Sequence, residues 1–465
     1  MAKREMIGEL AEKIDQDVVI SGWIKNSRDH GKVIFWDVRD TSGVVQVVIY
    51  KKDLIELVKG FREEFLVTIA GKIQKRPDNL VNAELANGNL ELASESISLI
   101  SSCEVPPFEI HNSTNGVNEE TRLKYRYLDL RTARMARNIK TRHQFNLFIR
   151  NYLSKKTFTE IETPILTKGT PEGAREFIVP SRLSKGSFFV LPQSPQQYKQ
   201  LLMVAGFEKY FQLARCFRDE DQRGDRQPEF TQLDIEMSFV EEEDVLALTE
   251  QMMVEIVKEL FPEKKISNKP FPRIEYTEAI KKYKTDKPDL RKNKDDKNEL
   301  AFAWIIDFPL FEKTENSKGL TSSHHPFTRP RGSDMALLEK EPAKVRASAY
   351  DLVLNGFEIG GGSIRIHEED LQKKIFKILG ISDEEVNSRF GHLLRAFEYS
   401  PPPHGGIALG IDRVLSILLE EPNIREVIAF PKTGDAKDPM TGAPTPLPDM
   451  LLREAGVKLA EVKKK

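Results

Sequence analysis

The run Cys216–Phe239, CFRDEDQRGDRQPEFTQLDIEMSF, decides the fold. Its two apolar ends enclose a polar middle, which predicts two antiparallel strands joined by a long loop. Arg218 falls on the first strand. An arginine fixed there can bind an α-phosphate through two parallel hydrogen bonds and offset the negative charge that develops on it. A charged surface hairpin is the alternative interpretation of the same run.

The run Gly406–Leu419, GIALGIDRVLSILL, predicts a tight junction between a strand and an apolar helix. Arg413 falls at the start of that helix, where its side chain can stack on a purine or bind a γ-phosphate. This signal alone is weak, because packing often requires a glycine-rich strand before a helix.

The run Tyr350–His367, YDLVLNGFEIGGGSIRIH, contains Asn-Gly, the strongest signal for a two-residue hairpin. In that hairpin Asp351 and Glu358 share one face, and two such carboxylates can hold Mg²⁺ bound to ATP phosphates. Three glycines follow, Gly360–Gly362. They weaken a strand unless something approaches its backbone closely, and an ATP ring is the expected partner. Arg365 supplies a further fixed cation, whereas two surface acids are the alternative interpretation.

The first hundred residues alternate short apolar segments with turn signals. They predict three strands, a helix and two strands, as in a small OB-type barrel, with an SH3-like barrel as the alternative. Residues 104–118 contain paired prolines and predict a linker. We therefore expect an α+β protein with a barrel at 1–103 and a larger domain at 119–465. The expected barrel elements are the strands Val18–Trp23, Val33–Val38, Val44–Tyr50, Phe65–Ile73 and Leu90–Ile100 and the helix Asp53–Phe61.

Composition narrows the class of protein. The chain has 465 residues with 70 basic and 72 acidic side chains, a net charge of −2. A near-neutral total excludes a globally basic nucleic-acid coat but allows a local basic face. Cys103 and Cys216 are too few and too far apart for a disulfide framework or a zinc site. No signal peptide or long apolar run is apparent, which predicts a cytoplasmic protein without membrane spans.

Together the three runs resemble motifs 2 and 3, and the strand between them, of class II aminoacyl-tRNA synthetases. Phe158–Leu166, FTEIETPIL, is similar to motif 1, whose proline, here Pro164, lies at the interface of a homodimer in that class. The resemblance extends over nearly the whole chain and narrows to the bacterial aspartyl-tRNA synthetases. The further segments that carry it are Gly169–Arg175, Leu191–Lys199, Trp304–Glu312, His324–Thr328 and Ala429–Lys432.

The resemblance implies L-aspartate, ATP with Mg²⁺ and tRNA(Asp) as the molecules bound. It implies that Lys199 and Arg365 hold the aspartate side chain, with Asp234 orienting the lysine. Two cations facing a small pocket would reject asparagine, which cannot offset their desolvation. It implies that Glu172, Ser194 and Gln196 bind the ammonium region of the substrate. Other implied aspartate ligands are Arg218 and the loop histidines His324 and His325. Implied ATP ligands are Arg218, Asp219, Glu220, Gln227, Glu358, Gly410, Ile411, Asp412 and Arg413, with Asp351 and Glu358 for the metal. Arg218 is the implied catalytic residue, and no side-chain nucleophile is needed.

In the barrel, the resemblance implies that Phe35 stacks on an anticodon base and that Gln46 reads one. A barrel-core position is the alternative for Phe35. We expect Arg28–Gly31 to form a loop beside it. Strict members of the family tend to have leucine at the position of His30, whereas those that also charge tRNA(Asn) tend to have histidine. We therefore predict tRNA(Asn) as a further substrate. A plain surface histidine, and with it a strict enzyme, is the alternative.

One departure from the family concerns an inserted domain, which bacterial members usually carry and which is missing here near residues 291–300. The charged tract Lys281–Lys297 is expected to be a solvated surface connection. Rival interpretations are an asparagine or lysine synthetase and a non-catalytic RNA-binding relative. Lys199 with Arg365 opposes the first rival, and the presence of every site arginine opposes the second.

Overall fold

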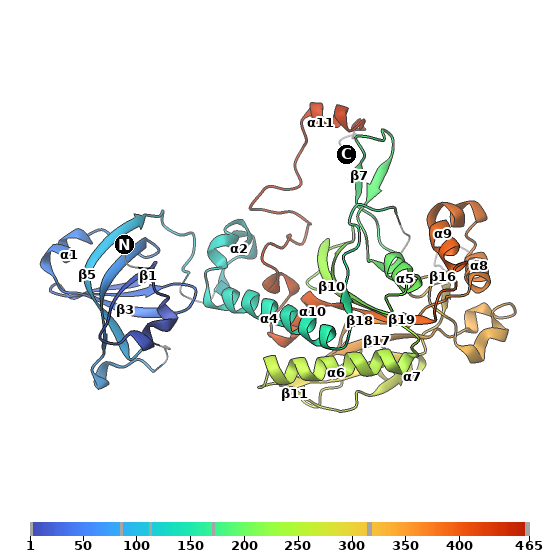
Figure 1. The fold of residues 1–465 in the computed structure, drawn as a ribbon, viewed down its shortest axis with the longest axis horizontal. Helices are drawn as coiled ribbons and strands as arrows, with labels where there is room; N and C mark the ends of the chain where they lie inside the picture. Colours follow the sequence, from blue (N-terminus) through green and yellow to red (C-terminus); the bar gives the residue numbers. More distant parts are fainter. Residues whose placement is uncertain (1–2, 84–86, 111–113, 170–172, 314–318, 461–465) are drawn as a thin grey trace. The chain divides into compact units, whose positions relative to one another are not determined.

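The computed structural model describes residues 3–83, 87–110, 114–169, 173–313 and 319–460. The chain divides into two compact units, Met1–Val117 and Asn118–Lys465. The first is a small β-barrel, and the second combines a large sheet with helices (Figure 1). The fold class is α+β, as predicted.

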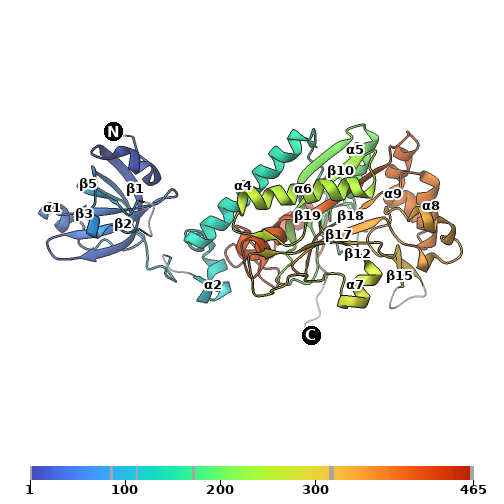
Figure 2. The ribbon, with the colours of Figure 1, turned by 90° about the horizontal axis from the view of Figure 1, so that it is seen from below.

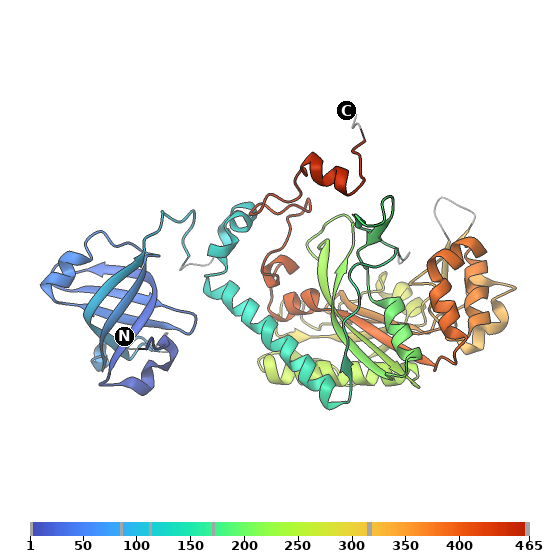
Figure 3. The same ribbon diagram turned by 45° about the horizontal axis from the view of Figure 1, so that its top comes forward.

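The first unit is a closed five-stranded barrel with the strand order β1-β2-β3-β5-β4 (Figure 3). One short helix, α1, lies between β3 and β4 in the sequence. All five expected strands and the expected helix are present, so the OB-type architecture is confirmed. The elements are β1(Asp17–Asp29), β2(Ile34–Arg39), β3(Val44–Ile49), α1(Lys52–Leu57), β4(Leu66–Lys75) and β5(Leu90–Ser101).

Strand β2 shows how the barrel separates its core from its outer face. Ile34, Trp36 and Val38 are buried, while Phe35 and Asp37 between them are only half-buried. Successive side chains of a strand point to opposite faces, so Phe35 lies on the outer face. The alternative that placed Phe35 in the barrel core is therefore wrong.

Strand β1 is longer than predicted. Arg28 pairs with Phe35 and Asp29 with Ile34, so these two residues belong to β1 and not to a loop. The connection begins at His30, whose backbone N–H donates to the carbonyl of Val33 at 3.0 Å. The sequence did not predict this extension, because the last residues of β1 are polar and show no alternation of apolar side chains. They are part of the strand because they pair with β2.

The second unit is built on an eight-stranded sheet with the order β12-β14-β17-β18-β19-β10-β9-β6. Its neighbours pair antiparallel except at the two edges, where β12 with β14 and β6 with β9 are parallel. The predicted pair of antiparallel strands in the deciding run is confirmed as β9 and β10. The strands are β6(Thr159–Glu160), β9(Lys209–Phe217), β10(Glu229–Ser238), β12(Arg273–Glu275), β14(Phe302–Ile306), β17(Ala349–Leu354), β18(Phe357–Ile364) and β19(His404–Gly410).

The main core lies between one face of this sheet and three helices, α4(Ala133–Lys155), α6(Glu242–Leu260) and α10(Ile411–Leu418). Figure 2 looks onto α6, which lies across this face. Leu233 and Ile235 of β10 point into the core, so Asp234 and Glu236 belong to the opposite face. The buried carboxylates therefore mark the face that carries polar chemistry.

The remaining elements surround this frame, and no helix in the described part of the chain is long and apolar enough to span a membrane. Two of them, α8 and α9, pack around Phe327 in a separate apolar cluster. The helices are α2(Glu119–Lys124), α3(Arg126–Asp129), α5(Gln196–Val204), α7(Tyr276–Tyr283), α8(Glu369–Ile378), α9(Asp383–Phe397) and α11(Asp449–Glu454). Three two-stranded sheets pair β7(Ile178–Pro180) with β8(Phe188–Val190), β11(Lys265–Ile266) with β13(Glu299–Leu300), and β15(Phe311–Lys313) with β16(Leu320–Ser322).

Helices α2 and α3 are joined to a segment about three hundred residues later. Arg122 makes two hydrogen bonds to the carboxylate of Glu426, at 2.9 and 2.8 Å. Arg126, 1 % exposed, donates to the backbone carbonyls of Arg425, Ile428 and Ala429 at 2.7–2.9 Å. These arginines hold the start of the unit against its later part.

Candidate active site

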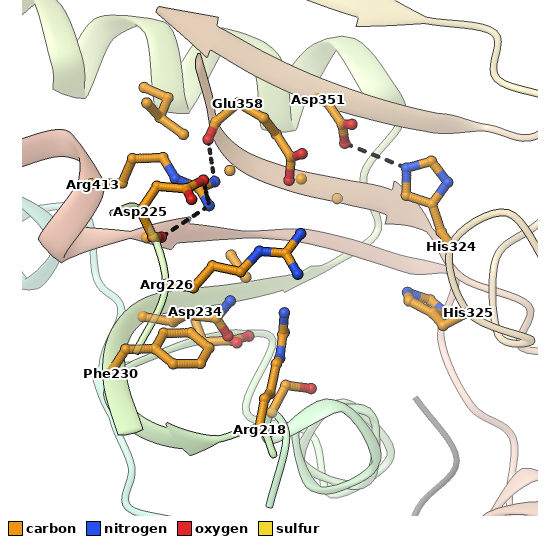
Figure 4. Close-up of a pocket in the computed structure, with 18 of the residues that line it drawn as sticks. Arg218, Asp225, Arg226, Phe230, Asp234, His324, His325, Asp351, Glu358 and Arg413 are labelled. Atoms are coloured by element: carbon orange, nitrogen blue, oxygen red, sulfur yellow. Dashed lines mark hydrogen bonds and ion pairs between the residues drawn. The ribbon is translucent and has the colours of Figure 1, made fainter. Parts of the chain in front are cut away.

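A cavity of about 550 Å³ lies on the polar face of the sheet (Figure 4). The structure brings into its lining most of the residues that the sequence singled out. They are Ser194, Gln196, Lys199, Arg218, Glu220, Gln227, Asp234, His324, His325, Asp351, Glu358, Arg365, Gly410, Asp412 and Arg413.

Of the described residues expected to bind aspartate or ATP, Asp219 and Ile411 are not among those that line the cavity. Asp219 is exposed, and its backbone N–H donates to the carbonyl of Arg175. The side chain of Ile411 lies in the main apolar core at 1 % exposure, because it begins the buried face of α10. Glu172 lies outside the described residues.

One end of the cavity is a buried group of two cations and two carboxylates. The Nζ atom of Lys199 lies 2.5 Å from Oδ1 of Asp234 and 3.2 Å from Oε2 of Glu236. Arg365 donates to both oxygens of Glu236, at 2.9 and 3.2 Å. All four side chains are at most 2 % exposed. Each cation therefore already has a carboxylate partner, and Asp234 contacts Lys199 as expected, while the pairing of Arg365 with Glu236 was not predicted.

The two carboxyl groups of this cluster, Asp234 and Glu236, have pKa values shifted in opposite directions. Burial alone would raise the pKa of Glu236, but Arg365 and Lys199 together lower it to about 2. Burial raises the pKa of Asp234 above its ordinary value, against the attraction of Lys199. The Oδ2 atom of Asp234 has no hydrogen-bond partner within the described residues, so it is available to a ligand.

The two loop histidines lie beside this group in different protonation environments. Burial and the cation Arg365 hold the pKa of His325 well below its usual value, so its neutral Nε2 accepts from Arg365 at 2.8 Å. Nε2 of His324 lies 3.4 Å from Oδ1 of Asp351. Burial opposes the charged form of His324, but that carboxylate raises its pKa above the usual value.

The other end of the cavity is more open and carries arginines. The guanidinium of Arg218 lies over the ring of Phe230, 5.1 Å from its centroid. Arg218 directly follows β9, and its N–H donates to Pro228 at 2.9 Å. Arg413 contacts Asp225 at 3.2 Å and Arg226 contacts Glu220 at 3.0 Å, with 26 % and 47 % of the arginine side chains exposed.

Asp351 and Glu358 lie on the opposite side of the cavity from Arg218 (Figure 4). Val353 pairs with Glu358 across the turn, so Asp351, two residues from Val353, shares a face with Glu358 as predicted. A bulge at Ile359 then shifts the register, but both carboxylates still reach the cavity. No group of three or more His, Cys, Asp or Glu side chains able to hold a metal occurs in the described ranges.

The comparisons with known proteins agree with this geometry. Residues 118–434 match the tRNA synthetases class II (D, K and N), and residues 18–100 match the OB-fold nucleic acid binding domain. The chain belongs to the class II tRNA synthetases.

Two relatives illustrate how far the similarity extends. The aspartate–tRNA(Asp/Asn) ligase of Thermoanaerobacter sp. (strain X514) is 41% identical over 99% of this chain and 98% of its own length. The aspartate–tRNA ligase of Listeria monocytogenes serovar 1/2a is 40% identical over 98% of each.

Solved structures show the same fold. A putative aspartyl-tRNA synthetase from Leishmania major Friedlin matches with a TM-score of 0.75 and 22% identity, over 92% of this chain and 94% of that one. The asparaginyl-tRNA synthetase from Pyrococcus horikoshii complexed with asparaginyl-adenylate matches with a TM-score of 0.74 and 23% identity, over 93% and 99%.

Two polar residues of this synthetase that were expected to bind ATP are engaged by the protein itself. Asp412 accepts from the backbone N–H of Thr231 at 3.0 Å and pairs with Arg142. The amide of Gln227 donates to and accepts from the backbone of Lys432, at 3.0 and 2.7 Å. Both residues therefore hold the walls of the site in place.

The glycines of β18 line the cavity, but their close neighbours belong to the synthetase. A Cβ on Gly361 would lie 2.5 Å from Oδ1 of Asp351. A Cβ on Gly360 or Gly362 would lie 2.6 or 2.2 Å from a backbone carbonyl of β19. The close approach expected of an ATP ring is thus already made by the adjacent strand and by a carboxylate.

The sequence patterns did not single out Glu236, which is central to the closed end. Its position two residues after Asp234 in one strand was a usable signal, because such residues share a face.

The tract Lys281–Lys297 was expected to be a plain surface connection. Instead its first residues belong to α7, and Asp286 and Lys287 line the cavity; nothing in the sequence indicated this.

Proposed function

We propose that this synthetase is an aspartate–tRNA ligase, which adenylates L-aspartate with ATP and transfers it to the 3′ end of tRNA(Asp). The buried group of Lys199, Asp234, Glu236 and Arg365 is the observation that carries the proposal. Relatives about 40% identical over nearly the full chain are named aspartate–tRNA(Asp/Asn) ligase and aspartate–tRNA ligase.

The hydrogen-bond capacity of the two cations supports an anionic substrate. Lys199 has three N–H bonds, two of them directed at Asp234 and Glu236. Arg365 has five, of which two go to Glu236, one to Ser363 and one to His325. One N–H on each cation is therefore left within the described structure. One such donor on each cation suits the two oxygens of a carboxylate.

Asparagine fits this pair of donors badly. Its side-chain amide offers one acceptor and two donors, so one cation would face an N–H group. A buried donor left against another donor loses its hydrogen bond, which discriminates strongly against the wrong substrate. Lysine would add a third cation. The donor count therefore favours aspartate over the substrates of the other two members of this family.

The open end of the cavity supports the first chemical step. The aspartate α-carboxylate would attack the α-phosphorus in line and release pyrophosphate. Arg218 presents a planar fork of donors to the α-phosphate, where negative charge develops. Stacking on Phe230 holds its guanidinium in position. The tRNA 3′-terminal hydroxyl would then attack the adenylate carbonyl, so both steps proceed without a side-chain nucleophile and depend on positioning.

Asp351 and Glu358 fit the metal that such a reaction uses. They face the arginines across the cavity, and Glu358 is held by Lys287 at 3.3 Å. Two carboxylates plus phosphate oxygens suit Mg²⁺, which binds through a few protein carboxylates and its substrate. Bound there, Mg²⁺ would neutralise phosphate charge.

ATP–pyrophosphate exchange with each amino acid in turn tests the proposal. We expect aspartate alone to support exchange above background. Exchange with asparagine or lysine instead would favour the corresponding synthetase. A folded protein without exchange for any amino acid would favour a non-catalytic RNA-binding relative.

We further propose that the barrel binds the anticodon through its outer face. Phe35 lies there half-buried, and the ring of His30 meets it edge-on, with centroids 5.7 Å apart. Gln46 accepts from Arg28 at 3.3 Å and donates to Glu91 at 3.1 Å, so its amide is held in a polar network. An aromatic ring beside fixed polar groups suits stacking and reading of single-stranded bases.

The ring of His30 supports relaxed tRNA choice. The anticodons of tRNA(Asp) and tRNA(Asn) differ at one pyrimidine, and an imidazole can hydrogen-bond or stack with either. We propose that tRNA(Asn) is charged as well. Charging both transcripts side by side tests this. A preference for tRNA(Asp) beyond about a hundredfold, ~2.7 kcal/mol, would establish a strict enzyme.

The edge of the large sheet supports a homodimer. Strand β6 is the edge strand, and Pro164 follows it on the surface with Ile165 and Leu166, which are 46 % and 53 % exposed. Exposed apolar residues beside a sheet edge suit burial by a second copy. Light scattering should give twice the chain mass. A stable monomer with full activity would contradict this proposal.

Finally, we propose that the chain acts in the cytoplasm. We also propose an anticodon-binding domain at 1–103, a linker at 104–118 and a catalytic domain at 119–465.

The alignment with the Thermoanaerobacter relative spans 587 positions, more than the 465 residues here. This difference supports a domain missing from this chain, which we place at residues 291–300.

A further inference from the structure

A chain of buried hydrogen bonds runs from the wall of the cavity into the core of the second unit. Nε2 of Gln196 donates to Oε1 of Gln200 at 3.0 Å. Nε2 of Gln200 lies 3.2 Å from Nε2 of His404, and Nδ1 of His404 lies 2.8 Å from the carbonyl oxygen of Pro402. Gln200 and His404 are fully buried and Gln196 is 4 % exposed. Of these three residues, Gln196 is the one that lines the cavity.

The Pro402 carbonyl fixes the state of the imidazole. A carbonyl oxygen only accepts, so Nδ1 of His404 must carry the hydrogen. Burial lowers the pKa of His404; Glu236 acts against this, while Arg365 and His367 reinforce it. The ring is therefore neutral, and its Nε2 offers a lone pair.

That lone pair fixes both glutamine amides in turn. Gln200 must direct its NH₂ group at His404, which turns its carbonyl oxygen towards Gln196. Gln196 must then donate its own NH₂ group to that oxygen. Its carbonyl oxygen is left as the atom for the cavity. The orientation of Gln196 thus follows from Pro402 through two intermediate residues.

We infer that His404 and Gln200 are positioning residues that make Gln196 present a hydrogen-bond acceptor to the substrate ammonium group. The inference rests on the proposed function, in which an amino acid binds at this end. The unpartnered Oδ2 of Asp234 lies in the same lining and supplies a second acceptor. A reversed Gln196 amide would set donors against an ammonium, which also only donates.

Substitution of Gln200 by methionine tests the inference. Methionine has similar length and only a weak acceptor in its thioether sulfur, so Gln196 can reverse its amide. We expect the KM for aspartate in pyrophosphate exchange to rise about tenfold. The inhibition constant of succinate, which has the two carboxylates but no ammonium, should stay within about twofold. A general distortion of the pocket would weaken both ligands.

Two companion variants sharpen the result. Gln200→Glu keeps an acceptor for Gln196, whether the shared proton lies on the new carboxyl or on His404, and should restore the aspartate KM to within about threefold. Gln197→Met is the matched control. This neighbour in α5 is equally buried, and its amide has no partner among the described residues. It should leave both constants unchanged. If Gln200→Met does not fold, Gln200→Leu takes its place.

The inference is overturned if Gln200→Met leaves the aspartate KM unchanged, if aspartate and succinate weaken equally, or if Gln200→Glu is as defective as Gln200→Met. Failure of the proposed function looks different, because the wild-type protein would then show no exchange with aspartate. If another amino acid supported exchange, its KM would replace that of aspartate in the same comparison, since every amino acid carries the ammonium group.

Discussion

The two ends of the cavity are built in opposite ways. At one end Lys199, Asp234, Glu236 and Arg365 are all at most 2 % exposed and are bonded to one another. At the other end Arg226 is 47 % exposed. The closed end holds its charges before any ligand arrives, whereas the arginines of the open end are partly exposed to solvent.

The difference reflects what each end must recognise. A small amino acid offers few contacts, so selectivity requires groups whose orientation is fixed in advance and whose desolvation is already complete. A nucleotide brings several charges of its own, and exposed arginines can adjust to them. We therefore expect changes at the closed end to alter stability and amino-acid affinity together, and changes at the open end to alter ATP binding or catalysis with little effect on stability.

Arg218→Ala should have the largest effect of the variants considered. It removes the donors that face the α-phosphate, so adenylate formation should fall by about a thousandfold or more. Because the side chain lies at the open end, the melting temperature should change little. Pyrophosphate exchange and thermal unfolding measure the two quantities. Normal exchange in the folded variant would contradict the role of Arg218, and a large loss of stability would contradict the comparison.

Glu236→Gln should destabilise the protein, because it leaves Arg365 and Lys199 without the carboxylate they share. We expect the free energy of unfolding to fall by about 3–5 kcal/mol in denaturant titrations near pH 7. Asp225→Asn, at the open end, is the matched control and should cost well under 1 kcal/mol. Equal losses in the two variants would mean that the ends do not differ.

The stability difference between the wild type and Glu236→Gln should also depend on pH. The pKa of Glu236 is lowered to about 2 from an ordinary value of 4.5. A lowered carboxylate pKa stabilises the fold above the ordinary value and stops doing so as the pH falls through the lowered one. The stability difference between the wild type and Glu236→Gln should therefore shrink as the pH falls from about 4.5 towards 2. A difference independent of pH would contradict the assignment.

Lys199→Met should weaken aspartate activation tenfold to a hundredfold, about 1.5–3 kcal/mol for a charge-assisted hydrogen bond. Lys287→Met removes the same charge at the open end, where the lysine pairs with Glu358. The control should affect the KM for ATP more than that for aspartate. Unchanged aspartate kinetics in Lys199→Met would overturn the substrate assignment.

The smallest effect is expected in the barrel, where His30 is exposed. His30→Leu should shift the ratio of charging towards tRNA(Asp) by several-fold to about tenfold, ~1 kcal/mol. Kinetics with the two transcripts measure the shift, and pyrophosphate exchange should not change. An unaltered ratio would make His30 a bystander.

Local patterns predicted the frame of the site well. The Asn355-Gly356 turn set the register of a hairpin, and that register placed Asp351 and Glu358 together. What the patterns missed depends on contacts between distant segments. The pairing of Arg365 with Glu236 joins residues 129 positions apart, and no local period reports it. Lys287 reaches the cavity from a tract whose composition resembled any solvated surface.

The hydrogen bonds of Arg122 and Arg126 to the segment around Glu426 join the start of the second unit to its later part. They also have a consequence for synthesis of the chain. Arg122 is synthesised about three hundred residues before Glu426. The backbone carbonyl groups that accept hydrogen bonds from Arg126 are also synthesised about three hundred residues after it. Until then, Asp129, which lies close to them in the sequence, is the carboxylate available to both guanidinium groups, and their partners near Glu426 are missing. A nascent chain halted before residue 420 would thus keep this corner open and depend on chaperones, however well its barrel had already folded.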